Sequence, residues 1–211
     1  QNDRQYLFLF SWLKIPPSMS DTNPDTFHPS DRNAWRQWLA RHHDVKISVW
    51  VVFYKVKTGQ RGLSWSEAVD EALCFGWIDS KAMPLDEHRY MQFFSRRKPK
   101  SVWSRINKEK VDRLIADGLM AEAGLRSIAI AKENGSWTSL DAVEDLIIPP
   151  DLEKAFKKHK GSKTFFTGLS KSVRKAMLQW IAMAKLPETR QRRINEVAEL
   201  GGKGERPKQF G

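Results

Sequence analysis

The sequence lacks several features that mark particular classes of protein. Cys74 is its only cysteine among 211 residues, which excludes an intramolecular disulfide and a cysteine-based metal cluster. The longest apolar run near the N-terminus, Tyr6 to Phe10, is too short to span a bilayer. With Arg4 before it and Pro16-Pro17 after it, the run also matches a secretory signal poorly. We therefore expect no membrane span and a cytoplasmic protein.

Sequence motifs typical of particular enzyme classes are also missing. The chain contains no Walker A loop, no G-x-G-x-x-G, no C-x-x-C and no H-E-x-x-H. It has neither a G-x-S-x-G nucleophile elbow nor a recognised nucleic-acid-binding motif. The sequence therefore predicts no cofactor and no metal, and it leaves open whether the protein is an enzyme.

Tryptophan and positive charge are abundant. The chain has nine tryptophans, and most should be buried because each carries a large apolar area. The net charge of +11 is uneven: residues 1–80 are neutral, 81–111 hold nine basic side chains against three acidic ones, and 150–211 hold fifteen against six. Residues 112–149 between these basic blocks are acidic. Such blocks attract polyanions, although a solvated basic surface is an equal alternative.

The periodicity predicts an α+β protein: a small N-terminal sheet with two helices, followed by an all-helical C-terminal half. Ser30 begins the first predicted helix, Ser64 and Glu67 form a capping box for the second, and Gly76 ends the second in the left-handed conformation. The predicted strands are 47–54, 77–80 and 90–94. The helices predicted in the second half are 105–117, capped by Ser104, then 121–133, 151–159, 171–184, capped by Ser170, and 187–200.

These elements suggest four parts. Residues 1–27 are expected to be a disordered or non-native leader, since Met19-Ser20-Asp21 resembles a natural start. An α+β subdomain should occupy 28–103, a helical subdomain 104–200, and a flexible basic tail 201–211.

Three stretches carry a family resemblance: Leu73-Cys74-Phe75-Gly76-Trp77-Ile78-Asp79-Ser80, residues 98–108 (KPKSVWSRINK) and residues 184–194 (AKLPETRQRRI). They resemble the YdeI/OmpD-associated family of bacterial proteins, and the likeness extends over residues 28–200. Arg96 departs from the pattern, since many relatives have proline there. The resemblance implies bacteriocin protection or resistance to cationic antimicrobial agents, which is a phenotype without a settled biochemical activity.

The strongest candidate site is the start of the helix at Arg105. Free backbone N–H groups and the helix dipole favour an anion there, and arginine can clamp it in bidentate fashion. The predicted anion-binding residues are Arg97, Lys100, Ser101, Arg105, Asn107, Lys108, Arg190 and Arg193. Trp77 and Trp103 either stack on a ligand or anchor the core. Arg190 and Arg193 either close over the same site or, as we favour, pair with acidic residues of 112–149.

Other reactive side chains have structural explanations that we favour. Asp79, the one weak catalytic candidate, is better explained as a partner of Arg97 or another basic residue. Ser104 is better placed as a helix cap than as a nucleophile. Cys74, between Leu73 and Phe75, is expected to be a buried small hydrophobe.

Three functions remain compatible with the sequence. The first is a cytosolic protein that binds a small anionic or phosphorylated ligand in a basic, tryptophan-lined cleft. The second is nucleic-acid binding through the basic blocks, which predicts a steep salt dependence. The third is an interaction module whose protein partner is unknown.

Overall fold

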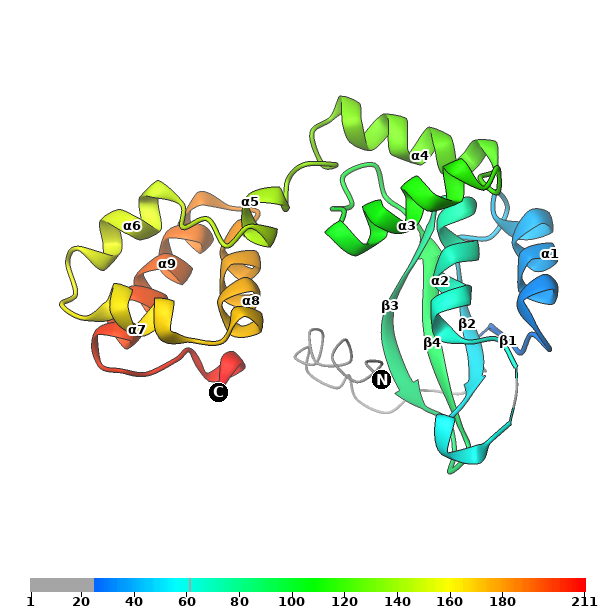
Figure 1. Cartoon of the computed structure of the whole chain (residues 1–211), viewed down its shortest axis with the longest axis horizontal. Coiled ribbons are helices and arrows are strands. Elements are labelled where there is room, and N and C mark those ends of the chain that lie inside the picture. The colour runs from blue at the N-terminus through cyan, green and yellow to red at the C-terminus, as the bar shows by residue number, and fades with distance from the viewer. Residues whose placement is uncertain (1–24, 61) are drawn as a thin grey trace. The chain divides into compact units, whose positions relative to one another are not determined.

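The computed structural model describes residues 25–60 and 62–211 (Figure 1). The chain divides into two compact units, with the division between Trp137 and Thr138. We call the described residues up to Trp137 the N-terminal unit and residues 138–211 the C-terminal unit. The first contains a four-stranded sheet with helices and the second is helical, so the predicted α+β fold class is confirmed.

The sheet of the N-terminal unit has the strand order β1-β2-β4-β3. Its strands are β1 (Thr26–Phe27), β2 (Ser48–Tyr54), β3 (Trp77–Pro84) and β4 (Arg89–Arg96). The β1–β2 pair is parallel, whereas β4 pairs antiparallel with both β2 and β3. With only two residues, β1 is too short to show a period in the sequence.

Strand β3 lies at one edge of the sheet and contains a bulge. Asp79 pairs with Phe94 and Ala82 with Gln92, so that Ser80 and Lys81 together stand opposite Phe93. The side chain of Lys81 lies over the rings of Trp50 and Phe93, with its Nζ 5.3 and 5.7 Å from their centroids. Pairing resumes after the bulge, so β3 extends to Pro84 beyond the predicted 77–80, and Asp79 is the last residue before the irregularity.

One face of the sheet carries the core of this unit. Val49, Val51 and Phe53 alternate along β2 onto this face, and the register places Phe94 opposite Val49. The helices of the unit are α1 (Arg32–His42), α2 (Trp65–Cys74), α3 (Arg105–Ala116) and α4 (Glu122–Glu133), together with the short 3₁₀ helix η1 (Val56–Thr58). Side chains of all four α-helices join the same hydrophobic cluster as the strands.

Helix α2 lies at the centre of the helical layer, in contact with α1, α3, α4 and β3. It begins with the predicted capping box, in which Ser64 and Glu67 satisfy each other's backbone N–H groups. Its middle contains two consecutive acidic residues, Asp70 and Glu71, which are 6% and 2% exposed. Carboxylates at this depth require cationic partners, because the cost of desolvating an unpaired charge is large.

The two carboxylates find their partners on different helices. Glu71 accepts hydrogen bonds from Arg32 Nε and Arg36 Nη1 of α1, both at 2.6 Å. Asp70 accepts from Lys110 and from Arg113 Nη2 of α3, the latter at 2.5 Å. These ion pairs join α2 to α1 on one side and to α3 on the other.

The turn that ends α2 is packed closely against α4. Gly76 has φ +72°, which confirms the predicted left-handed end of α2. The carbonyl of Cys74 accepts a hydrogen bond from Ala121 N at 3.0 Å. A Cβ atom on Gly124 would lie 2.3 Å from that same carbonyl oxygen, so only glycine fits in α4 at this point.

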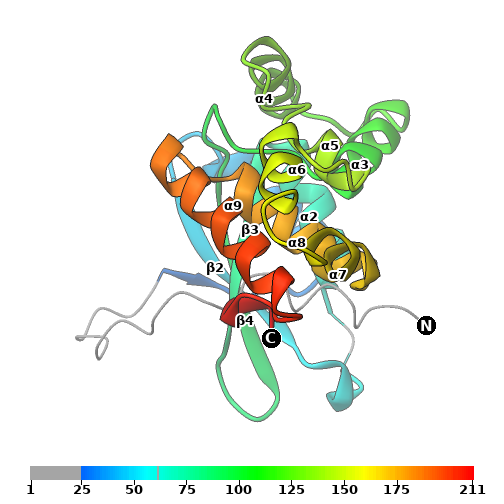
Figure 2. The same ribbon diagram turned by 90° about the vertical axis from the view of Figure 1, so that its left-hand side faces the viewer.

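The C-terminal unit is built around its longest helix, α9 (Pro187–Gly202). The other elements are α5 (Asp141–Glu144), α6 (Pro150–Phe156), α7 (Ser162–Gly168), α8 (Lys171–Ala182) and the 3₁₀ helix η2 (Lys208–Phe210). Helix α9 packs against α6, α7 and α8 (Figure 2). Its buried stripe of Ile194, Val197 and Ala198 supplies the apolar face that the helical period predicts. Within the described residues, no helix combines the length and hydrophobicity required to cross a membrane.

We expect Gly124→Ala to lower the free energy of unfolding by at least about 2 kcal/mol, because the new methyl group would overlap the Cys74 carbonyl and push α4 away from α2. Gly168→Ala is the control, since a Cβ there meets no atom within 4 Å and should change stability by no more than about 0.5 kcal/mol. Urea denaturation measures both variants. Equal stability of the two would show that the close approach of α4 is not a constraint.

Candidate functional site

The start of α3 has the local structure that the sequence predicts. Ser104 is extended and its Oγ accepts a hydrogen bond from Asn107 N at 3.3 Å, which confirms Ser104 as the N-cap. The turn before it is held by Ser101, whose Oγ accepts from Lys98 N at 3.1 Å and whose N–H donates to Lys98 O at 2.9 Å. The helix start is therefore ordered by side chains of its own sequence.

Further contacts fix this turn to α4. The carbonyl of Pro99 accepts from Asn134 Nδ2 at 2.8 Å and from Ser136 Oγ at 3.3 Å. Lys98 and Lys100 are exposed on the turn. Lys108, one turn into α3, places its ammonium 5.4 Å from the ring centroid of Trp137. The turn thus holds its exposed cations on a fixed backbone.

Arg97 is the most unusual cation of the region. Its guanidinium carbon lies 3.6 Å from the ring centroid of Trp103, and its Nη1 donates to Val102 O at 3.2 Å. Its Nε is buried and has no hydrogen-bond partner. Burial lowers the pKa of Arg97 to about 10, and the nearby Asp79 carboxylate only partly opposes this shift. In the part of the chain that the structure describes, no carboxylate forms an ion pair with Arg97.

Asp79 lies on the helix-facing side of β3 and has neutral partners. Its Oδ2 accepts from Trp65 Nε1 at 2.9 Å and from Gln92 Nε2 at 3.0 Å. Burial raises the pKa of Asp79, although these hydrogen bonds and the charge of Arg97 act in the opposite direction. Asp79 and Arg97 are therefore within electrostatic range but do not form the direct ion pair that the sequence suggested.

The two candidate stacking tryptophans are both core residues. Trp77 is 0% exposed and donates through Nε1 to His43 O at 3.1 Å, while its ring contacts Trp38. Trp103 is 1% exposed and lies beside Trp137, with 5.0 Å between ring centroids. Arg97 and Trp137 are thus the ring neighbours of Trp103, and Trp77 belongs to the packing around α1.

Two residues that the sequence reasoning missed support Asp79. Trp65 is the first residue of α2 and Gln92 faces the helices from β4, where it is 6% exposed. Gln92 Nε2 also donates to Ser80 O at 3.1 Å, which ties the bulge of β3 to β4. The sequence does single out Gln92, because it is the one polar residue on the strand face that also carries Tyr90 and Phe94, and a buried polar side chain there requires a partner.

Arg190 and Arg193 lie in the C-terminal unit, where both engage the last turn of α8. Arg190 forms a bidentate pair with Asp151, at 2.7 Å from Nε and 3.0 Å from Nη2, and its Nη1 donates to Ile181 O at 3.4 Å. Arg193 Nη1 donates to Trp180 O at 2.5 Å and the guanidinium carbon lies 4.8 Å from the Trp180 ring centroid. Both arginines thus donate to carbonyls in the last turn of α8, and Ile181 O also accepts from Ala184 N at 3.2 Å. The acidic partner of Arg190 is Asp151, outside the segment 112–149 that we favoured.

The remaining reactive side chains have structural roles. Cys74 is fully buried and its burial raises the pKa of the thiol to about 11, which fits a small hydrophobic residue. His42 and His43 end α1 with Nδ1 atoms 2.7 and 3.0 Å from the carbonyl oxygens of Trp38 and Leu39.

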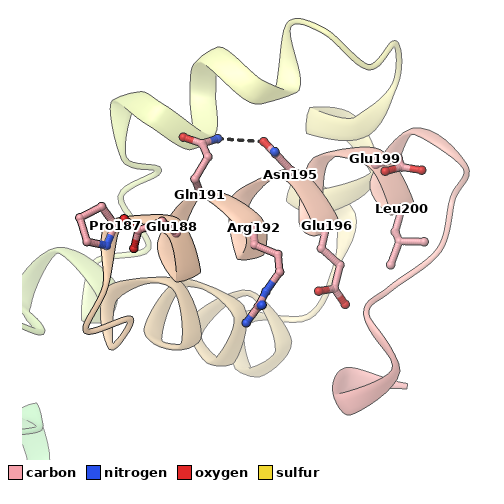
Figure 3. A pocket seen from close by; sticks show the side chains of 8 residues that line it. All are labelled: Pro187, Glu188, Gln191, Arg192, Asn195, Glu196, Glu199 and Leu200. Atoms are coloured by element: carbon pink, nitrogen blue, oxygen red, sulfur yellow. Dashed lines mark hydrogen bonds between the residues drawn. The ribbon is translucent and has the colours of Figure 1, made fainter.

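Two cavities lie elsewhere on the described surface. The larger, an open cavity of about 860 Å³, runs along one side of α9 (Figure 3). Glu188, Arg192 and Glu196 are among its lining residues, and Gln191 is hydrogen-bonded there to Asn195 at 2.8 Å. The smaller, about 390 Å³, lies beside η1 and is lined by Lys57, Thr58, Gln60, Glu87 and His88. Neither includes Asp79 or Arg97.

Comparison with known families agrees with this division of the chain. Residues 145–204 match the family described as "Bacteriocin-protection, YdeI or OmpD-Associated". The predicted resemblance to the YdeI/OmpD-associated family is thus supported over residues 145–204, a partial match that lies within the C-terminal unit and includes the stretch 184–194. Residues 27–127 match a separate "Domain of unknown function (DUF8412)", which includes the stretches 73–80 and 98–108. No curated protein and no solved structure gave a match.

Asp79→Asn should keep the fold, because an amide oxygen still accepts from Trp65 and Gln92. The folded-state pKa of Asp79 is raised above its ordinary 3.8, so ionisation costs stability as the pH rises through the folded-state pKa. Asparagine does not ionise, so the variant does not lose stability in this pH range. We therefore expect its stability relative to the parent to increase between about pH 4 and about pH 7 in urea denaturation. A difference that does not vary with pH would contradict a buried, ionising carboxylate at position 79.

Arg190→Lys should lower the free energy of unfolding of the C-terminal unit by about 1–2 kcal/mol, because lysine cannot bridge both oxygens of Asp151 and also reach Ile181 O. Arg192→Lys, an exposed position on the same helix, should stay within about 0.5 kcal/mol of the parent. Amide hydrogen exchange of α9 in the full chain, measured by mass spectrometry, distinguishes the two. Equal effects would show that the contacts of Arg190 with Asp151 and Ile181 O do not stabilise this unit.

Proposed function

We propose that the N-terminal unit binds a small anionic ligand, such as a phosphorylated or carboxylated metabolite, at Arg97 beside the start of α3. The observation that carries this proposal is the buried Nε of Arg97, which lacks a hydrogen-bond partner although the guanidinium is stacked on Trp103. A buried donor without a partner costs about 1–3 kcal/mol, and more when the group is charged. An anion that enters beside Arg97 would supply the missing acceptor and add to the counter-charge of Asp79, and it requires the atoms that cover Nε to move aside.

The surroundings of Arg97 favour an anion over other ligands. Lys98 and Lys100 lie exposed on the same turn, and the first N–H groups of α3 add the positive end of a helix dipole. Trp103 fixes the plane of the guanidinium, so a carboxylate or phosphate would meet a pre-oriented fork of donors. Asp79, held by Trp65 and Gln92, would disfavour ligands of high negative charge or accept a donor from them.

The proposal is for binding and includes no reaction. Around Arg97 and Asp79, the described residues pair no serine, cysteine or threonine with a general base, as nucleophilic catalysis would require. The family description associates the chain with bacteriocin protection, and a bound metabolite is one route by which a protein could signal or relieve such stress. We place the protein in the cytoplasm, in keeping with its single cysteine buried as a thiol.

The test is isothermal titration of the full chain with inorganic phosphate, glycerol phosphate and AMP. Arg97→Ala should raise the dissociation constant of a binding probe at least about tenfold, since a charge-assisted bidentate contact is worth about 1.5–3 kcal/mol. Arg96→Ala removes the same charge one residue earlier, from an exposed side chain whose contact is to Lys46 O, and should leave affinity within about twofold.

Two outcomes would overturn the proposal. One is the absence of binding by all three probes and by a wider set of anionic metabolites in thermal-shift assays, where a ligand raises apparent stability by RT ln(1 + [L]/Kd). The other is equal loss of affinity in the Arg96 and Arg97 variants, because this would assign the effect to net charge. Thermal unfolding of each variant confirms that binding is measured on folded protein.

A further inference from the structure

The end of α6, the start of α7 and the connection between them hold five lysines within ten residues. They are Lys154, Lys157, Lys158, Lys160 and Lys163, which we call the basic turn. The surrounding sequence is equally one-sided: no aspartate or glutamate occurs between Glu153 and Glu188, whereas nine lysines and arginines do. This is the most strongly charged segment of the chain that contains no acid.

Most of this charge is not neutralised within the protein. Lys163 pairs with Glu153 at 2.6 Å. Lys154, Lys157, Lys158 and Lys160 are exposed, and they form no ion pair or hydrogen bond through their side chains in the part of the chain that the structure describes. Four unpaired ammonium groups on one short turn repel each other, and a polyanion would relieve that repulsion.

The backbone that carries these lysines is anchored. Ser162 is 0% exposed, and its Oγ donates to the carbonyls at the end of α6 and in the turn, at 3.1 Å to Phe156 O and 2.7 Å to His159 O. Gly161 has φ +83°, which lets the chain reverse into α7. The turn also rests on the end of α9, where Gly201 and Gly202 allow Ser162 and His159 to approach closely. The lysines are therefore presented from a fixed loop.

The acidic side chains of the same unit lie on either side of this segment, within residues 141–153 and 188–205. Glu188, Glu196 and Glu199 line the open cavity along α9 (Figure 3). Helix α9 also carries Arg190, Arg192 and Arg193, so it has both signs of charge, whereas residues 154–187 have only positive charge. Solubility alone does not require so long a segment of a single charge sign, since mixed charges serve that purpose as well.

We propose that the basic turn binds the phosphate backbone of double-stranded nucleic acid without reading its sequence. Lysines supply phosphate contacts and attraction at long range, as non-specific binding requires. The turn offers no exposed aromatic ring on which an unpaired base could stack, because Phe156 and Phe166 are buried and Phe165 is half-buried. It also lacks an exposed large apolar residue that would anchor it in a membrane interface.

The experiment measures binding of the full chain to a fluorescent duplex of about 20 base pairs by anisotropy over a range of salt concentrations. The variant Lys157→Gln/Lys158→Gln/Lys160→Gln should bind at least about tenfold more weakly at low salt. The slope of log K against log salt should also fall in magnitude by about three, one per lost phosphate contact. The control Lys57→Gln/Lys185→Gln/Lys208→Gln changes the net charge equally at exposed sites outside the turn and should keep the slope.

Three results would overturn the proposal: no duplex binding by the parent chain, the same loss in both triple variants, or binding of the parent to vesicles containing phosphatidylglycerol with none to the duplex. The Arg97→Ala variant should bind the duplex like the parent, because Arg97 belongs to the other unit. The duplex-binding test is therefore independent of the proposal that Arg97 binds an anionic metabolite, and a negative result for one proposal does not contradict the other. Circular dichroism establishes that both triple variants are folded.

Discussion

The N-terminal unit depends on two neighbouring carboxylates in the middle of α2. Adjacent positions on a helix point in different directions, so Asp70 reaches α3 while Glu71 reaches α1. Neither carboxylate could remain buried without its cations. A shift of α1 or α3 would leave one of the buried carboxylates without its partner. Arg36 extends the arrangement by donating to Leu119 O at 2.8 Å, just before α4. The frame around Arg97 is therefore set by ion pairs as well as by apolar packing.

Two arginines, Arg97 and Arg190, show how context decides the role of one residue type. Arg190 has a carboxylate in bidentate contact and a helix carbonyl beside it, so its donors are used within the fold. Arg97 has an aromatic ring, one carbonyl and an unused buried donor. Arg190 lies within one of the stretches that carry the family resemblance, and Arg97 directly precedes another. The contacts of Arg190 are explained by its structural role, whereas Arg97 has a buried Nε donor that lacks an acceptor.

Local rules predicted much of this fold, and contacts between distant residues account for the rest. Ser64 with Glu67, Ser104 and Gly76 act within a few residues of their own positions, so sequence spacing alone identifies them. The partners of Asp79 and Arg190 cannot be found this way, because Gln92 reaches Asp79 across a strand pair and Asp151 lies 39 residues from Arg190. The four cations that hold Asp70 and Glu71 likewise follow from how three helices pack.

The bulge in β3 has a consequence for how the protein behaves in a crowded solution. An edge strand normally offers a row of free N–H and C=O groups to which another chain can add. In β3 the ladder is interrupted at Ser80 and Lys81, and the lysine side chain occupies the aromatic surface of Trp50 and Phe93. A foreign strand would find only short, out-of-phase stretches on which to pair. The irregularity beside Asp79 thus also hinders the addition of another strand at this edge of the sheet.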